Sequence, residues 1–136
     1  MTTRYLLDSD ICIYAMKRRS DSLLKRFDRF APVSAISVIV YGELWFGRTA
    51  SRRQDEATAY LAALLETIEV LPLPIEAATH YGRVRAELES AGRPIGANDT
   101  WIAAHALAED LTLVTNNVRE LSRVPDLRVE NWAEST

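Results

Sequence analysis

Two hydrophobic spacings alternate along the chain. Short runs of apolar residues recur at intervals, and between them lie longer stretches in which apolar residues repeat every three or four positions. The short runs predict buried strands, and the longer stretches predict amphipathic helices. The predicted strands lie at residues 5–7, 33–36, 68–71, 111–115 and 127–129. The predicted helices lie at residues 10–16, 20–30, 38–46, 51–67, 75–91, 98–109 and 118–122.

Proline and glycine mark several of the element boundaries. Pro32 precedes the second strand, and Pro72 and Pro74 follow the third. We expect Gly47 to end the third helix and Gly92 to end the fifth, because glycine readily adopts the left-handed conformation that closes a helix.

Strands that alternate with helices are typical of the α/β class. We therefore expect a three-layer α/β/α sandwich with a central, mostly parallel sheet of about five strands. No linker-like segment divides the chain, so residues 1–136 are expected to form a single domain. In such sheets the functional cleft lies beyond the carboxyl ends of the strands.

The formal charge of −3 is unevenly distributed along the chain. Residues 1–53 hold ten Lys and Arg against five Asp and Glu, whereas residues 54–136 hold six against fourteen. The basic residues of the first part include Lys17, Arg18, Arg19, Lys25, Arg26, Arg29, Arg48, Arg52 and Arg53. Such a surface can attract a polyanion such as nucleic acid, although a solvated helical face is the simpler interpretation.

Several features are those expected of a cytoplasmic protein. Cys12 is the only cysteine, so no internal disulfide can form. Asp8 and Asp10 interrupt the first apolar stretch, which argues against a signal peptide there. The longest apolar-rich run, residues 31–45, is broken by polar residues and is too short to span a bilayer. We expect no membrane partner.

Three acids in the first part of the chain occupy unusual positions. Asp8 and Asp10 directly follow the first strand, where an acid can cap the next helix, but capping requires only one of them. Glu43 lies in a helix that is apolar on nearly every side, where an ionised carboxylate needs a partner. An ion pair with Arg48 or Arg52 would supply one, and a divalent metal ion shared with other acids would supply another.

Two further polar clusters lie at the ends of predicted elements. Asp99 is at the start of the sixth helix, where an acid also complements the helix dipole. Thr115, Asn116 and Asn117 end the fourth strand, where asparagine is expected as a turn residue. This cluster can also orient water or a metal-bound phosphate, and Glu120 is a further candidate acid close to it.

Other common chemistries find no support. His80 and His105 lie within predicted helices, and no Cys or His residues have the spacing of a zinc site. We expect both histidines to be core or surface residues. The chain has neither a phosphate-cradling glycine-rich loop nor a serine nucleophile elbow, so nucleotide hydrolysis and acyl transfer are unsupported.

The order of these motifs resembles that of the PIN-domain family and, within it, of the VapC toxins of bacterial toxin–antitoxin pairs. The matching segments are Leu6-Leu7-Asp8-Ser9-Asp10-Ile11, Ile36-Ser37, Tyr41-Gly42-Glu43-Leu44, Gly96-Ala97-Asn98-Asp99-Thr100-Trp101-Ile102-Ala103 and Leu113-Val114-Thr115-Asn116-Asn117-Val118-Arg119-Glu120. The resemblance implies a PIN-like fold and an endoribonuclease that depends on Mg²⁺ or Mn²⁺. It also implies a homodimer that a VapB-like antitoxin neutralises in a toxin–antitoxin hetero-oligomer.

The resemblance implies a role for five residues by position. Asp8 and Asp99 would bind the metal directly, and Glu43 would complete the acidic pocket. Asn117 would occupy the fourth, usually acidic, position. Ser37 would support the pocket by hydrogen bonding.

The chain departs from the family pattern at two positions. Asp10 stands where the family usually has Asn, and Asn117 stands where it often has Asp. The fourth ligand is therefore open, and Asn116 or Glu120 can share that role with Asn117 or Asp10.

The residue types suit the implied chemistry. Carboxylate oxygens are hard ligands, which Mg²⁺ and Mn²⁺ prefer. Hydrolysis by metal-activated water would leave a 5′-phosphate and a 3′-hydroxyl, while the basic residues hold the RNA backbone. An arginine of an antitoxin could occupy the acidic pocket in place of the metal.

Two other functions are open from sequence. One is a PIN-like subunit with weak or no catalysis that acts mainly by complexing a DNA-binding antitoxin. The other is a haloacid-dehalogenase-like phosphatase, because Asp8-Ser9-Asp10 and Leu113-Val114-Thr115-Asn116 also resemble two motifs of that class. That class needs a later lysine, whereas Lys17 and Lys25 are the only lysines here, so it ranks below the nuclease.

Overall fold

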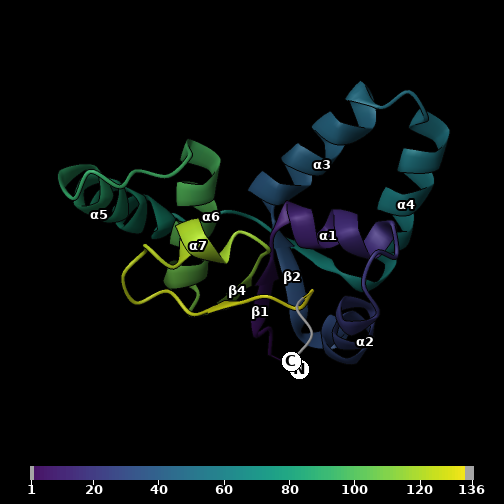
Figure 1. Cartoon of the computed structure of the whole chain (residues 1–136), viewed down its shortest axis with the longest axis horizontal. Coiled ribbons are helices and arrows are strands. Elements are labelled where there is room, and N and C mark those ends of the chain that lie inside the picture. The colour runs from purple at the N-terminus through teal and green to yellow at the C-terminus, as the bar shows by residue number, and fades with distance from the viewer. Residues whose placement is uncertain (1, 134–136) are drawn as a thin grey trace.

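The structure, a computed structural model, describes residues 2–133. Its centre is a five-stranded sheet in the order β3-β2-β1-β4-β5 (Figure 1). The strands are β1 Tyr5–Leu7, β2 Ser34–Ser37, β3 Glu69–Leu71, β4 Thr112–Val114 and β5 Val129–Glu130. Each neighbouring pair of strands is parallel, which confirms the expected parallel sheet.

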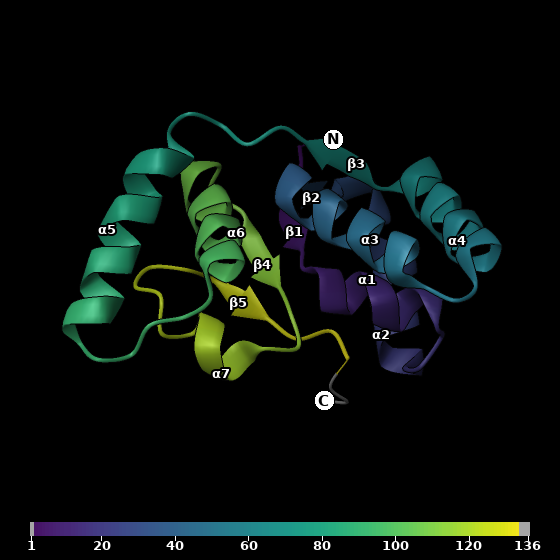
Figure 2. The ribbon, with the colours of Figure 1, turned by 90° about the horizontal axis from the view of Figure 1, so that it is seen from above.

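Helices flank this sheet. They are α1 Ser9–Met16, α2 Asp21–Phe30, α3 Val38–Ala50, α4 Gln54–Thr67, α5 Ala77–Ser90, α6 Ala97–Ala108 and α7 Val118–Leu121, with a short 3₁₀ helix at Ala31–Val33. Figures 1 and 2 show α1 to α4 gathered toward one end of the molecule and α5 to α7 toward the other. The α/β fold class is therefore confirmed. No helix within residues 2–133 is long and apolar enough to cross a membrane.

The predicted end of the third helix is wrong. α3 continues through Gly47 to Ala50. A glycine inside a helix costs only about 1 kcal/mol relative to alanine, and tertiary contacts can offset that cost. The inner face of α3 is held by the buried Leu44. Its last turn is tied to α4 through Arg48, whose Nε donates to Oγ1 of Thr58 at 2.9 Å.

β1 is enclosed on both sides by its neighbours β2 and β4, and all three of its residues are buried. Trp132, only 1% exposed, packs against the ring of Tyr5 with the ring centroids 5.1 Å apart and against Phe30 at 5.6 Å. This aromatic cluster joins the segment after β5 to β1 and to the end of α2. It therefore stabilises the central strand that leads into the acids.

The carboxyl ends of β1, β2 and β4 meet at one edge of the sheet. The register pairs Leu7 with Val114, so the next residues, Asp8 and Thr115, are neighbours. The backbone N–H of Asp8 continues the pairing by donating to the carbonyl of Val114 at 2.9 Å. β2 ends at Ser37 on the other side of β1. This edge is where parallel sheets place their functional clefts.

Candidate active site

Asp8 is held in one orientation at the end of β1. Its Oδ1 accepts a hydrogen bond from the backbone N–H of Ser9 at 2.8 Å, so it caps α1. Its Oδ2 accepts a hydrogen bond from the hydroxyl of Thr115, also at 2.8 Å. The residue is only 6% exposed, and this burial raises the pKa of its carboxyl despite the hydrogen bonds. Capping of α1 therefore uses only Oδ1 of Asp8 and does not explain the position of Oδ2.

Asp10 lies on the first turn of α1 and faces the end of β4. Its Oδ2 accepts a hydrogen bond from the backbone N–H of Asn116 at 3.2 Å and lies 3.4 Å from the hydroxyl of Thr115. Burial, and then the negative charge of Asp8, raise the pKa of Asp10 to about 6. The second acid after β1 thus faces the same site as the first.

Glu43 reaches the site from α3. Burial, and then the charge of Asp8, raise the pKa of Glu43, while hydrogen bonds with the side chains of Asn98 and Ser9 lower it. Its Oε1 is buried without a hydrogen-bond partner among the described residues. Within residues 2–133 no ion pair joins Glu43 to Arg48 or Arg52, so the ion-pair interpretation is wrong.

Asp99 connects the acids with one another. It lies in the first turn of α6, which begins without a side-chain cap. Burial raises the pKa of Asp99 to about 6, and the charges of Asp8, Glu43, Glu120 and Asp10 add to the increase in that order. Four carboxylates from α1, α3, α7 and the end of β1 are therefore close enough to Asp99 to repel its charge.

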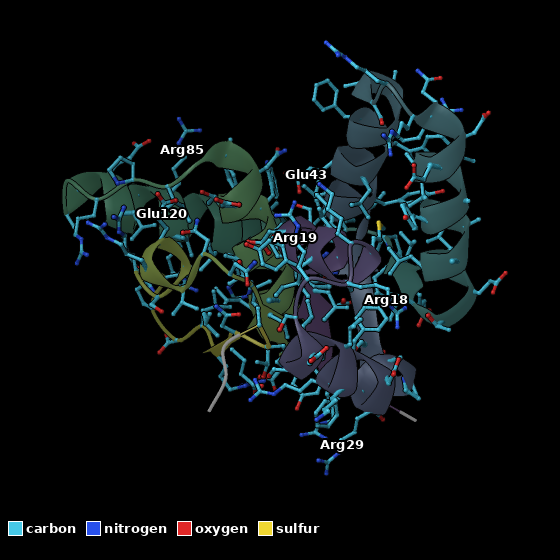
Figure 3. The ribbon with its side chains drawn as sticks, turned by 45° about the vertical axis from the view of Figure 1, so that its right-hand side comes forward. Arg18, Arg19, Arg29, Glu43, Arg85 and Glu120 are labelled. Carbon is cyan, nitrogen blue, oxygen red and sulfur yellow. The ribbon has the colours of Figure 1, made fainter. Side chains whose placement is uncertain are left out.

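Asn117 contributes through its neighbours. Its backbone N–H donates to Oγ1 of Thr115 at 3.0 Å, and its side-chain Nδ2 donates to Oε2 of Glu120 at 3.1 Å. Figure 3 labels Glu43 on α3 and Glu120 on α7, on the two sides of the site. The side-chain Oδ1 of Asn116 is buried without a hydrogen-bond partner among the described residues. The side-chain amide of Asn117 thus helps to fix the position of the Glu120 carboxylate.

The five carboxylates have no protein cation among them. In residues 2–133 none of Asp8, Asp10, Glu43, Asp99 and Glu120 forms an ion pair with a Lys, Arg or His side chain. Uncompensated, partly buried acids destabilise a fold unless a positive ligand meets them. The cluster therefore has the electrostatics of a cation site.

The donor set suits a divalent ion that keeps part of its water shell. No group of three or more His, Cys, Asp or Glu side chains in the described part of the chain is arranged to hold a metal ion by itself. Mg²⁺ does not require such a cage, because it commonly binds through one or two carboxylates and keeps several waters. Asp8 and Asp99 provide two carboxylates, and the unpartnered Oε1 of Glu43 can accept a hydrogen bond from a water beside them. The residues fit this kind of ion.

Three polar residues of the site were not singled out from the sequence. Ser9 and Asn98 are hydrogen-bonded to Glu43, and each stands next to an acid in the sequence, which is a usable signal. His105 was expected to be a core or surface histidine, and it is buried. One of its ring nitrogens is hydrogen-bonded to Ser37, a contact between residues far apart in the sequence that no local pattern reveals.

Comparison with known proteins agrees with this site. A model of the PIN domain matches residues 5–127. Ribonuclease VapC2 of Rickettsia felis is 40% identical over 130 residues, which cover 94% of this chain and 97% of that protein. The tRNA(fMet)-specific endonuclease VapC of Shigella flexneri is 38% identical over 130 residues, which cover 96% of this chain and 98% of that protein.

Solved structures agree as well. The crystal structure of VapBC2 from Rickettsia felis bound to a promoter DNA fragment contains a chain that is 39% identical, with a TM-score of 0.89 over 96% of this chain and 99% of that one. DNA-bound VapBC from Salmonella typhimurium contains one that is 35% identical, with a TM-score of 0.91 over the same shares. The chain therefore belongs to the PIN-domain family. Within that family it is a nuclease of the VapC type, as its motifs predicted.

Proposed function

We propose that residues 1–136 form a single PIN-like domain that cleaves RNA with the help of Mg²⁺ or Mn²⁺, as the toxin of a toxin–antitoxin pair. One observation carries the proposal. The pKa of Asp99 is raised to about 6 by burial and by four surrounding carboxylates, and no protein cation in the described residues offsets their charge. A divalent cation would remove that repulsion.

Two carboxylates are proposed as the direct ligands of this ion. The hydrogen bonds of Asp8 to Ser9 and Thr115 fix its carboxylate in place, and Asp99 faces it from the start of α6. Glu43 completes the acidic pocket, and its unpartnered Oε1 can accept a hydrogen bond from a water. Asn117 acts by holding Glu120 toward the pocket.

The bound ion would supply a more acidic water for attack on a phosphodiester and positive charge for the phosphate oxygens. Asp8 fixes where that chemistry takes place, because its burial and its hydrogen bonds to Ser9 and Thr115 limit its movement. Since water and not the ribose 2′-hydroxyl is the proposed nucleophile, the products carry a 5′-phosphate and a 3′-hydroxyl. Cleavage is proposed to take place in the cytoplasm, where RNA substrates are found.

The RNA backbone is proposed to lie on the basic surface at the end of α1. Lys17, Arg18 and Arg19 are exposed there, and Figure 3 shows Arg18 and Arg19 beside α1. The guanidinium of Arg19 lies 5.9 Å from the centre of the Tyr14 ring, which favours one orientation of the arginine. Phosphate contacts of this kind give affinity without strong sequence preference.

The proposed protein partner is a VapB-like antitoxin, because the similar solved structures are of VapBC complexes. An apolar groove of about 310 Å³ between α1, α3 and α4 offers a place for it. The groove is lined by Ile13, Met16, Leu44, Tyr60 and Leu61, and Glu43 also lines it. A helix of the antitoxin in this groove could place an arginine against the acids. A homodimer is proposed as the unit that binds it.

Cleavage of a structured RNA tests this function. The protein is incubated with the RNA in EDTA, in Mg²⁺ and in Mn²⁺, and the ends of the fragments are mapped. We expect cleavage only with metal, with 5′-phosphate and 3′-hydroxyl ends, and loss of cleavage in Asp8→Ala and Asp99→Ala. Equal cleavage by these variants, or cleavage that persists in EDTA, would overturn the proposal.

A further inference from the structure

His105 forms a buried polar link between α6, which carries Asp99, and the start of α3, which carries Glu43. It lies on α6 with 0% exposure, and both of its ring nitrogens have partners. Nδ1 lies 2.8 Å from Oγ of Ser37, and Nε2 lies 2.8 Å from Oε2 of Glu109. Ser37, also 0% exposed, caps α3 by accepting a hydrogen bond from the backbone N–H of Ile39 at 3.1 Å.

The chemistry of these groups sets the direction of the chain of hydrogen bonds. An ionised Glu109 can only accept, so Nε2 of His105 carries the proton and donates. In the neutral imidazole Nδ1 is then an acceptor, and the hydroxyl of Ser37 donates to it. The oxygen of Ser37 remains free to accept from Ile39. This arrangement gives each group in the series a hydrogen-bond partner, which makes the link specific.

The link stands at matched distances from the acids. Glu43 follows Ser37 by six positions on α3, and Asp99 precedes His105 by six positions on α6. Six residues correspond to about 9 Å along a helix axis. Figures 1 and 2 show α3 leaning away from α6 with distance from the sheet. The bond between Ser37 and His105 therefore joins the helices on the sheet side of the acids.

Repulsion between the acids opposes this arrangement. Glu43 on α3 and Asp99 in the first turn of α6 carry like charges when ionised, so the two carboxylates push the helices apart. A buried hydrogen bond resists such separation, because breaking it leaves a donor and an acceptor without partners inside the protein. The pair of Ser37 and His105 can thus hold the helices at the spacing that the acids need.

We propose that His105 is a positioning residue that sets the separation of Glu43 and Asp99 through its hydrogen bond to Ser37. The inference rests on the proposed function, in which these two acids belong to the metal site. Both ring nitrogens of His105 are bound to Ser37 and Glu109, so His105 is assigned no direct contact with the metal or the RNA. The competing explanation is that the ring of His105 only fills space in the core. In that case a substitution would have the same effect whether it keeps the hydrogen bond of Nδ1 or that of Nε2.

Two substitutions of His105 separate the explanations. His105→Asn keeps an oxygen near the position of Nδ1, so it can still accept from Ser37. His105→Gln places its amide near the position of Nε2, so it can reach Glu109 but not Ser37. Both remove the ring and create a cavity, so their effects on packing are similar. His80→Gln is the control, because His80 is partly exposed on α5 and is hydrogen-bonded to Arg83.

The measurements are Mn²⁺ affinity by electron paramagnetic resonance, kcat and KM for a structured RNA, and the thermal midpoint. We expect His105→Gln to weaken Mn²⁺ binding and lower kcat by about tenfold each, with KM for RNA unchanged. His105→Asn should stay within about threefold of the unsubstituted protein, and His80→Gln should match it. Equal losses in the two His105 variants, or unchanged Mn²⁺ affinity in His105→Gln, would overturn the inference.

A second set of variants tests the same hydrogen bond from the side of Ser37, in case the His105 variants fold poorly. Ser37→Ala removes the same hydrogen bond from the other side, together with the cap on the N–H of Ile39, with a small change in volume. We expect it to lose at least as much Mn²⁺ affinity as His105→Gln, and the double variant to lose no more than Ser37→Ala alone. Additive losses would show that the two residues act separately and would reject the inference. Absence of metal-dependent cleavage in the unsubstituted protein would reject the proposed function, whereas the Mn²⁺ affinities of the variants test the link.

Discussion

The hydroxyl of Thr115 donates a hydrogen bond to Oδ2 of Asp8 at 2.8 Å, across the boundary between β4 and β1. The hydroxyl oxygen of Thr115 in turn accepts a hydrogen bond from the backbone N–H of Asn117 at 3.0 Å. Thr115 is 0% exposed, so neither contact can be replaced easily by bulk water. One buried hydroxyl therefore fixes both the first proposed metal ligand and the turn that carries the last polar cluster.

Thr115→Val tests the importance of this hydroxyl. Valine has nearly the same shape but cannot donate, so the carboxylate of Asp8 loses a hydrogen bond that favours its charged form. We expect kcat for RNA cleavage at pH 7 to fall about tenfold, because positioning groups of metal ligands have effects of this size. Thr115→Ser keeps the hydroxyl and is expected to retain most of the activity. Equal rates for the valine and serine variants would show that the hydroxyl is unimportant.

The raised pKa values predict an unusual dependence of stability on pH. The pKa values of Asp10 and Asp99 are about 6 in the folded chain, above the ordinary value of 3.8 that applies when the chain is unfolded. Between these values the folded state binds more protons, so the stability of the metal-free protein falls as pH rises from about 4 to about 6 and levels off above that. The thermal midpoint without metal should be higher at pH 5.5 than at pH 7.5.

Asp99→Asn isolates the contribution of one acid to this effect. At pH 7.5 without metal, we expect the free energy of unfolding to rise by about 1 kcal/mol, a value reduced because solvent reaches the half-buried group. Asp55→Asn is the matched control, since Asp55 lies in the first turn of α4 but is exposed. Denaturant unfolding at pH 5.5 and 7.5 measures both. A loss of stability in Asp99→Asn at pH 7.5 would contradict the repulsion described for this cluster.

The basic surface predicts a dependence of RNA binding on salt. Arg18→Ala and Arg19→Ala should each weaken binding and reduce the slope of log K against log salt by about 0.7 to 0.9 if one phosphate contact is lost. KM for RNA should rise while kcat changes little. Arg85→Ala is the control, because Arg85 is ion-paired with Glu89 on α5 and lies on another side of the molecule (Figure 3). Identical salt slopes in all three variants would exclude the proposed backbone contact.

Much of the fold follows from local patterns in the chain. The short apolar runs and the amphipathic stretches predict the strands and helices because burial has a different period in each. The end of α3 was predicted wrongly because Gly47 disfavours a helix only weakly, and a contact with α4 decides its length. That contact joins Arg48 and Thr58, and no local pattern identifies the pair.

The residues of the site also divide into those that the sequence identifies and those whose role depends on the fold. Asp8 and Glu43 stand out in the sequence because a carboxylate next to a buried strand or inside an apolar helix needs a partner. The roles of Asn117 and His105 depend on contacts that only the folded chain makes. Asn117 is read from sequence as a possible ligand, whereas the structure shows its amide bound to Glu120. The sequence thus shows which residues carry functional groups, whereas the residues that they contact are known only from the fold.

Direct measurement of Mn²⁺ binding tests the central claim that Asp8 and Asp99 hold a divalent ion. Isothermal titration of Mn²⁺ into the unsubstituted protein, Asp99→Asn and Asp55→Asn is followed by RNA cleavage with the same samples. We expect Asp99→Asn to remain folded, to bind Mn²⁺ at least about tenfold more weakly and to lose cleavage, while Asp55→Asn matches the unsubstituted protein. Unchanged Mn²⁺ affinity and cleavage in folded Asp99→Asn would contradict the account.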